Sequence, residues 1–129
     1  MKLLLDTHIW LWSLSEPARV GKRLMQELKN PQNELWLSPI STWEALTLNA
    51  KGRIQLPHDL EAWVKKATAP FREAPLTHDI ALLARLLNLP HNDPADRFLA
   101  ATAQLLKLTL VTADGNLLGL GNISTLGNR

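Results

Sequence analysis

Short apolar runs alternate along the chain with longer amphipathic segments. Short runs of this kind indicate strands. They predict strands at residues 2–5, 34–38, 74–76 and 108–112, with a short edge strand near residues 122–124. Strands separated by helical segments are typical of a mainly parallel sheet, so the pattern predicts an α/β fold with four to five short strands.

Between the predicted strands, apolar side chains recur at helical spacing. One set at positions i, i+3, i+4 and i+7 is Leu60, Trp63, Val64 and Ala67. Similar spacing predicts helices at residues 17–30, 41–50, 80–87 and 93–106, and a short helix after Asp6. We find no internal repeat or linker, so residues 1–129 are expected to form a single domain.

Five Trp and no Tyr make an unusual aromatic balance. Trp10, Trp12 and Trp43 lie on the first and third predicted helices. They are expected either to pack in the core or to form a subunit or partner interface, where Trp is enriched.

Composition and charge exclude several classes of protein. A net charge of +2, from 14 Lys and Arg against 12 Asp and Glu, argues against nucleic-acid binding by bulk positive charge alone. No apolar run approaches the roughly 20 residues that cross a bilayer. Asp6 interrupts the first apolar run, so no signal peptide is expected. The absence of Cys excludes disulfides, thiolate zinc sites and cysteine nucleophiles, and it fits a cytoplasmic protein.

Five acidic residues follow predicted strands or lie near the starts of predicted helices: Asp6, Glu44, Asp93, Asp96 and Asp114. The carboxyl ends of parallel strands converge on one edge of a sheet, where ligands bind. These side chains are therefore expected to share one crevice. Removing them leaves 14 basic against seven acidic residues elsewhere, a balance that would attract a polyanion.

Each acid also has a structural interpretation. Asp6 and Asp93 each fit the N-cap of a following helix, and Asp114 fits a turn with the glycine after it. Ser41 and Glu44 fit the two ends of a capping box. Capping explains why an acid is tolerated at each place, but not why nearly every strand-to-helix junction on one edge has one.

Clustered carboxylates predict a metal site. Two carboxylates about 4 Å apart repel by roughly 4 kcal/mol at an effective dielectric constant near 20, so several are tolerated only when protonated or neutralised by cations. Oxygen ligands without Cys favour Mg²⁺ or Mn²⁺ over zinc, and one or two such ions are expected. Two ions can activate a water and stabilise the leaving oxygen of a phosphodiester.

Other polar residues flank the acids. Thr7 and Thr112 are expected to orient a water or a ligating carboxylate, whereas Ser41 is expected to cap its helix. His8 and His91 either line the crevice and touch phosphate or have structural roles.

An ordered set of motifs runs through nearly the whole chain: Leu4-Leu5-Asp6-Thr7-His8, Ser38-Pro39-Ile40-Ser41-Thr42-Trp43-Glu44, His91-Asn92-Asp93-Pro94-Ala95-Asp96-Arg97 and Leu110-Val111-Thr112-Ala113-Asp114. This set resembles the PIN-domain nucleases, specifically the VapC-type toxins of VapBC toxin–antitoxin modules. The resemblance implies a three-layer α/β/α PIN-like fold. It places Asp93 as a further, nearby acid and maps the family's acidic quartet onto Asp6, Glu44, Asp96 and Asp114.

The resemblance also implies an activity and partners. A VapC-type toxin is a Mg²⁺- or Mn²⁺-dependent endoribonuclease, is held inactive by a cognate antitoxin and is usually a homodimer. Arg97 follows the third acid and is expected either to contact RNA phosphate or to pair with a neighbouring acid. The alternative function is a catalytically silent PIN-like module that binds RNA or protein. The presence of all four quartet acids argues against it.

Three other folds of similar layout require residues that this chain lacks. A haloacid-dehalogenase-like phosphatase needs a second Asp two residues after the first, where His8 stands. A response-regulator receiver needs an acceptor Asp after its third strand and a Lys near its fifth, and neither arrangement is present. A nucleotide-binding Rossmann domain needs a Gly-rich loop after its first strand, and none follows residues 2–5.

Overall fold

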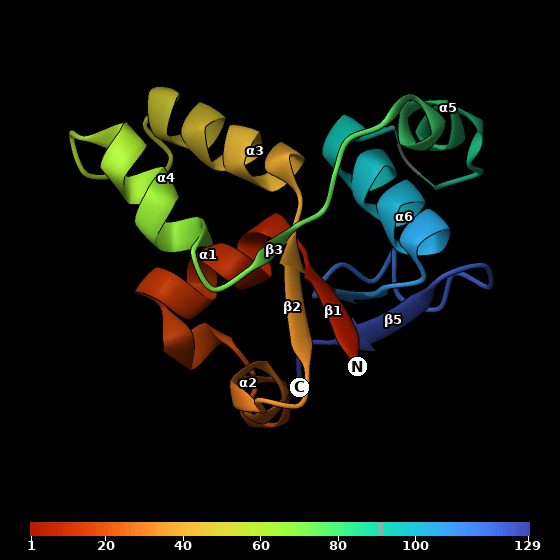
Figure 1. Cartoon of the computed structure of the whole chain (residues 1–129), viewed down its shortest axis with the longest axis horizontal. Helices are drawn as coiled ribbons and strands as arrows, with labels where there is room; N and C mark the ends of the chain where they lie inside the picture. The colour runs from red at the N-terminus through yellow and green to blue at the C-terminus, as the bar shows by residue number, and fades with distance from the viewer. Residues whose placement is uncertain (91) are drawn as a thin grey trace.

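A parallel sheet forms the centre of the computed structural model of the chain, which describes residues 1–90 and 92–129. Its strands, in the order β3-β2-β1-β4-β5 (Figure 1), are β1 (Lys2–Leu5), β2 (Glu34–Leu37), β3 (Arg72–Glu73), β4 (Thr109–Thr112) and β5 (Ser124–Gly127). The helices of the described residues are α1 (Thr7–Ser15), the 3₁₀ helix η1 (Pro17–Arg19), α2 (Lys22–Lys29), α3 (Pro39–Ala50), α4 (Leu60–Thr68), α5 (His78–Leu86) and α6 (Pro94–Leu106). Every strand pairing is parallel, as predicted.

Successive residues of β1 face two separate cores. Leu3 and Leu5 pack with Trp10 of α1 on one face of the sheet. Leu4 packs with Leu99 of α6 on the other face. Helices lie on both sides of the sheet, with α1 and α2 on one side and α5 and α6 on the other (Figure 1). Because both faces are buried, β1 is apolar at consecutive positions, which is why the strand reads as an unbroken apolar run.

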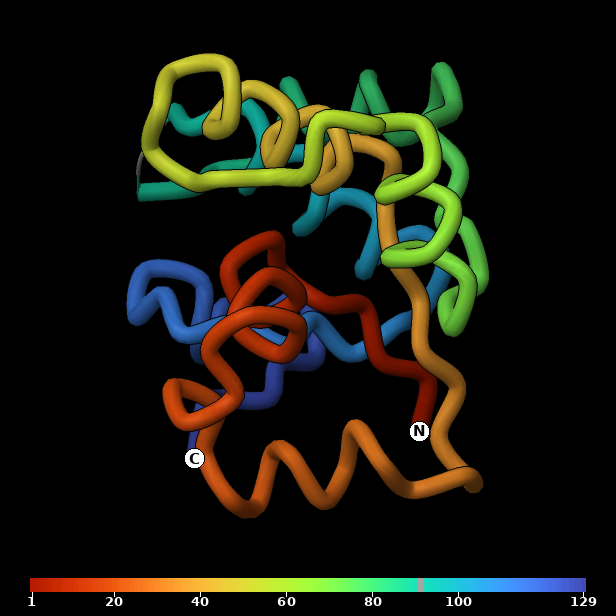
Figure 2. Tube along the Cα trace, turned by 90° about the vertical axis from the view of Figure 1, so that its left-hand side faces the viewer, coloured from red at the N-terminus to blue at the C-terminus, as the bar shows by residue number. Residues whose placement is uncertain are grey.

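The segment predicted as one helix over residues 17–30 is divided into η1 and α2. Val20 and Gly21 between them have extended backbone, with ψ angles of 128° and 152°. The far end of the chain packs against this break, because the Leu24 N–H donates to the Arg129 carbonyl at 3.0 Å. Figure 2 shows the C-terminus beside the segment that leads into α2. A tertiary contact therefore divides the predicted helix.

The third helix begins two residues earlier than predicted, at Pro39. Its N-cap is Ser38, whose hydroxyl accepts a hydrogen bond from the Ile40 N–H at 3.1 Å. The expectation that Ser41 caps this helix is wrong. Ser41 is fully buried and hydrogen-bonds the Thr7 hydroxyl at 2.9 Å.

The two edge strands are displaced from their predicted positions by a few residues, to residues 72–73 and 124–127. At β3 the ladder stops where Ala74 donates its N–H to the Leu37 carbonyl at 2.9 Å. The next residue, Pro75, has no N–H with which to continue the pairing.

The tryptophans differ in burial, and an interface role for any of them stays a prediction. Trp10 is fully buried and its indole N–H donates to the Ala67 carbonyl at 3.1 Å, so it is a core residue. Trp43 is 62% exposed on α3, where it is available to a partner. None of the helices in residues 1–90 and 92–129 combines the length and apolar character that spanning a membrane requires.

Candidate active site

A cavity of about 530 Å³ lies at the carboxyl ends of the adjacent strands β1 and β4. Asp6 follows β1 and Asp114 follows β4. Glu44 comes from α3, and Asp93 and Asp96 come from the start of α6. The structure thus brings together the five acids that the sequence predicts in one crevice. The remaining lining residues are His8, Trp12, Arg19 and Ala113.

Asp6 is held by hydrogen bonds to both of its carboxylate oxygens. Only 8% of the residue is exposed. Its Oδ1 accepts the backbone N–H of Thr7 at 2.7 Å, which caps α1 as predicted. Its Oδ2 accepts the hydroxyl of Thr112, also at 2.7 Å. The capping role and a place in the cavity are therefore compatible in the same side chain.

Thr112 connects two of the acids. Its hydroxyl donates to Asp6 and accepts the backbone N–H of Asp114 at 3.0 Å. The Asp114 Oδ1 accepts the N–H of Asn116 at 2.9 Å, the turn contact that its position before a glycine predicts. Thr112 is therefore placed to orient a carboxylate, the role expected of it.

Thr7 connects α1 with α3. Its hydroxyl oxygen lies 2.9 Å from that of Ser41, and both residues are fully buried. The Thr7 side chain also lies close enough to Glu44, one turn beyond Ser41 on α3, to lower the pKa of that carboxyl group. Glu44 lines the wall of the cavity.

Asp93 and Asp96 share the first turn of α6. The Asp93 Oδ1 accepts the N–H of Ala95 at 2.9 Å and that of Asp96 at 3.4 Å, and Pro94 occupies the first helical position. Asp93 is thus the predicted N-cap. Asp96 is not the cap, and its side chain lines the cavity.

Burial and mutual repulsion raise the pKa of Asp96 furthest. Burial is the largest cause, followed by repulsion from Asp6, Asp93 and the other acids, and the pKa rises from 3.8 to about 7. A displacement of this size in a cleft is typical of a functional site.

At Asp6 and Glu44, hydrogen bonds oppose the rise in pKa that burial causes. Burial raises the pKa of Asp6, whereas the bonds from the Thr112 hydroxyl and the Thr7 N–H lower it. Burial likewise raises the pKa of Glu44, whereas its bond with the Thr7 side chain lowers it. The two threonines therefore favour the charged forms of these carboxyl groups.

The donor set of the cavity fits a hard divalent cation. It offers several carboxylate oxygens, and the chain has no Cys. A cation would also relieve the repulsion that raises the pKa of Asp96. In residues 1–90 and 92–129, no three His, Asp or Glu side chains are grouped as a ready-made coordination shell.

A family model for the PIN domain matches residues 3–121. The chain belongs to the PIN-domain family. The resemblance stated from the sequence motifs is thereby confirmed. This PIN-domain chain is also 33% identical over 118 residues to ribonuclease VapC22 of Mycobacterium tuberculosis, and the match covers 89% of the chain and 88% of that protein.

Solved structures share the PIN fold of this chain. VapBC2 from Rickettsia felis, bound to a promoter DNA fragment, matches with a TM-score of 0.72 at 16% identity, over 100% of both chains. A toxin–antitoxin complex from Klebsiella pneumoniae matches with a TM-score of 0.71 at 23% identity, over 98% of both chains. These similarities confirm the predicted three-layer α/β architecture.

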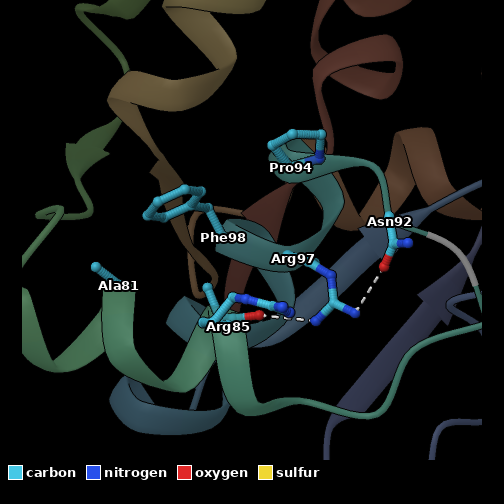
Figure 3. A pocket seen from close by; sticks show the side chains of 7 residues that line it. Ala81, Arg85, Asn92, Pro94, Arg97 and Phe98 are labelled. Carbon is cyan, nitrogen blue, oxygen red and sulfur yellow. Dashed lines mark hydrogen bonds between the residues drawn. The ribbon is translucent and has the colours of Figure 1, made fainter.

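Arg97 of this PIN domain lines a different cavity, between α5 and α6 (Figure 3). Its guanidinium donates to the carbonyls of Ala84 and Leu87 at 2.9 and 2.8 Å, and to the Asn92 side chain at 3.1 Å. The cation thus satisfies carbonyls at the C-terminal end of α5. The ion pairs found among the described residues do not include Arg97, and its pairing with a neighbouring acid stays a prediction. Contact between Arg97 and RNA phosphate stays a prediction.

Sequence reasoning missed two residues of the PIN cavity wall, Trp12 and Arg19. No motif connects Arg19 with the acids, because it reaches the cavity only when η1 packs back on α1. His8 lines the cavity, which is one of the two positions expected for it. The prediction for His91 lies outside the described residues.

Proposed function

We propose that this PIN-domain protein is a metal-dependent endoribonuclease, the toxin component of a type II toxin–antitoxin pair. The observation that carries the proposal is one cavity lined by five acids, among which the pKa of Asp96 rises to about 7. Such a cluster is unfavourable without bound cations, so its presence points to metal-dependent chemistry. The similarity to ribonuclease VapC22 supports RNA as the substrate.

The metal ligands in this proposal are the acidic quartet: Asp6, Glu44, Asp96 and Asp114. One or two Mg²⁺ or Mn²⁺ ions would activate a water and stabilise the leaving oxygen of an RNA phosphodiester. Thr112 orients Asp6 through its hydrogen bond, and Thr112 and Thr7 oppose the rise in pKa that burial causes at Asp6 and Glu44. Asp93 caps α6 and adds negative charge beside the quartet.

Control of the activity by a cognate antitoxin is supported by the structural neighbours, which include a VapBC protein and a toxin–antitoxin complex. A homodimer is supported by exposed apolar side chains, with Trp43 62% and Leu86 70% exposed. We expect residues 1–129 to act as one domain in the cytoplasm, where RNA and antitoxin are both available.

The chemistry of the RNA ends tests this function. Purified protein without antitoxin would be incubated with structured RNAs and Mn²⁺, and the ends at each cleavage site would be mapped. Because water rather than the ribose 2′-hydroxyl is the nucleophile, we expect 5′-phosphate and 3′-hydroxyl ends. Ends carrying 2′,3′-cyclic phosphate would contradict the mechanism. RNA that is bound but stays intact would favour the catalytically silent binding module.

A further inference from the structure

The acidic cavity repels the RNA that it is proposed to cut. Five carboxylates face a substrate that carries one negative charge at each phosphate. Among the described residues that line the cavity, Arg19 is the one permanently charged cation, and His8 is the other basic residue. The contacts of Arg19 therefore bear directly on how this cavity receives RNA.

Arg19 is stacked on an aromatic ring of the cavity wall. Its guanidinium carbon lies 4.2 Å from the centroid of the Trp12 ring, within the range of a cation–π contact. The Trp12 and His8 ring centroids are 5.9 Å apart, with their planes tilted by 52°. Arg19, Trp12 and His8 thus form a row of side chains on the wall of the acidic cavity.

The C-terminal tail holds the backbone that carries Arg19. The Asn128 side-chain amide donates from Nδ2 to the Arg19 carbonyl at 2.9 Å, and its Oδ1 accepts the Gly21 N–H at 2.7 Å. The tail runs beside this segment (Figure 2). Because these bonds fix the backbone on both sides of Val20, the position of Arg19 does not depend on its side-chain contacts alone.

The guanidinium of Arg19 is open to a phosphate. Within the described residues it donates one hydrogen bond, from Nη1 to the Glu16 Oε2 at 3.3 Å, although a guanidinium has five donors. The two side chains are 57% and 56% exposed, and exposed ion pairs of this kind are weak. A phosphate can therefore displace Glu16 and accept two parallel hydrogen bonds from the guanidinium.

We propose that Arg19 binds a backbone phosphate of the RNA strand at the acidic cavity, with Trp12 holding the guanidinium in place. This inference rests on the proposed ribonuclease function and adds the residue that positions its substrate. The Arg19 charge offsets the repulsion between the carboxylates and the RNA backbone. Its loss should weaken RNA binding without slowing the step that follows binding.

The test compares steady-state cleavage by wild-type protein with cleavage by Arg19→Ala and Arg19→Lys. For Arg19→Ala we expect KM to rise about tenfold or more, as for loss of a charge-assisted hydrogen bond, while kcat changes little. RNA binding should also be measured in EDTA at several salt concentrations. The slope of log K against log salt should be about 0.7 less steep for Arg19→Ala than for the wild type. Arg19→Lys should keep the salt slope, because the charge remains, and raise KM less.

Arg72 provides a matched control. Its guanidinium carbon lies 5.9 Å from the Trp36 ring centroid, and its Nε lies 3.7 Å from the Glu34 carboxylate. It therefore repeats the pairing of arginine with Trp and Glu, but it lines a cavity that does not contain the five acids. Arg72→Ala should leave KM, kcat and the salt slope close to those of the wild type.

The outcomes separate this inference from the proposed function. If wild-type protein cleaves RNA and Arg19→Ala behaves like Arg72→Ala, the Arg19 proposal is overturned and the ribonuclease function stands. If Arg19→Ala lowers kcat and leaves KM and the salt slope unchanged, Arg19 shapes the site and does not bind phosphate, which also overturns the proposal. If wild-type protein neither binds nor cleaves RNA, both proposals are overturned. Should Arg19→Ala fail to fold, Arg19→Gln takes its place, because it removes the charge and keeps most of the side chain, and an unchanged KM and salt slope in that variant would overturn the proposal.

Discussion

The Thr112 hydroxyl of β4 donates a hydrogen bond of 2.7 Å to the carboxylate of Asp6, which follows the adjacent strand β1. Strand register produces this contact, because Leu5 of β1 pairs with Val111 of β4. Asp6 directly follows Leu5, and Thr112 directly follows Val111. The bond lies where the acids meet, and Thr112 is fully buried. The sheet therefore orients a carboxylate of the proposed metal site through a neutral side chain.

Thr112→Val should reduce RNA cleavage about 10–100-fold, the usual effect of removing a group that orients a metal ligand. Valine keeps the shape of threonine and removes the donor to Asp6. Thr112→Ser should retain most of the activity, because it keeps the hydroxyl. Thr109→Val is the matched control on the same strand, where the hydroxyl contacts Ser124 outside the cavity. Equal rates for the two valine variants, measured as single-turnover cleavage, would contradict the role given to Thr112.

Asp96→Asn should raise the melting temperature of the metal-free protein by a few degrees. The change removes a charge that the other acids repel, and the N-cap of α6 stays in place because it is Asp93. Mg²⁺ should raise the melting temperature of the wild type, by mass action on the folded state, and should raise that of the variant less. Thermal unfolding in EDTA and in Mg²⁺ measures both effects.

Asp79→Asn is the control for this change, because Asp79 also lies in the first turn of a helix, on α5. Its loss should lower the melting temperature slightly, since an acid near a helix N-terminus is stabilising. If Asp96→Asn destabilises the protein by about 1 kcal/mol or more, its contribution to the helix outweighs the repulsion, contrary to our expectation.

The stability of the metal-free protein should fall as pH rises from about 4 to about 7. In this window folded Asp96, whose pKa is raised from 3.8 to about 7, keeps a proton that the unfolded chain has released. The folded state therefore binds more protons, and raising the pH favours unfolding. Melting temperatures in EDTA between about pH 5 and pH 8 should show a steeper fall for the wild type than for Asp96→Asn. Parallel curves for the two proteins would contradict this interpretation.

Gly21→Ala should destabilise the protein by about 1–3 kcal/mol, the usual range for overpacking. A Cβ at this position would lie 1.8 Å from the carbonyl carbon of Arg129, and backbone atoms on both sides must then move. Gly115→Ala is the control, because a Cβ there meets no atom within 4 Å. Denaturant unfolding of both variants measures the difference. Equal stabilities would mean that the C-terminal tail does not pack against the start of α2 in solution.

The arrangement of acids could be predicted from the sequence because each lies next to an element with a clear local pattern. Asp6 follows an apolar run whose bounds match β1, and Asp93 precedes a proline that marks the start of α6. The start of α3 was also readable, because Ser38 before a proline is itself an N-cap pattern. Ser41 and Glu44 also fit a capping box, which favoured a later start for the helix. The contact between Thr7 and the buried Ser41 joins distant parts of the chain, so no local sequence pattern predicts it.

The remaining differences come from contacts between distant parts of the chain. The break at Gly21 depends on Asn128, which accepts the Gly21 N–H at 2.7 Å. The same tail residue donates to the Arg19 carbonyl, where η1 turns towards Trp12. Arg97 likewise binds carbonyls of α5 that its sequence neighbours do not supply. Helical spacing and short motifs carry no information about such pairs, so the cation on the cavity wall could not be predicted.

RNA cleavage by wild-type protein, Asp6→Asn and Asp59→Asn in Mn²⁺, Mg²⁺ or EDTA tests most directly whether the acidic cavity is a metal-dependent nuclease site. Asp59 is the matched control, because like Asp6 it caps a helix, accepting the Ala62 N–H at 3.0 Å, and it lies outside the cavity. We expect cleavage by the wild type and Asp59→Asn with either metal and none in EDTA. Asp6→Asn should lose more than about 100-fold in rate, since even groups that only support a ligand contribute up to that amount. Cleavage that persists in EDTA, or that is equal in Asp6→Asn and the wild type, would contradict the assignment of this cavity as the active site.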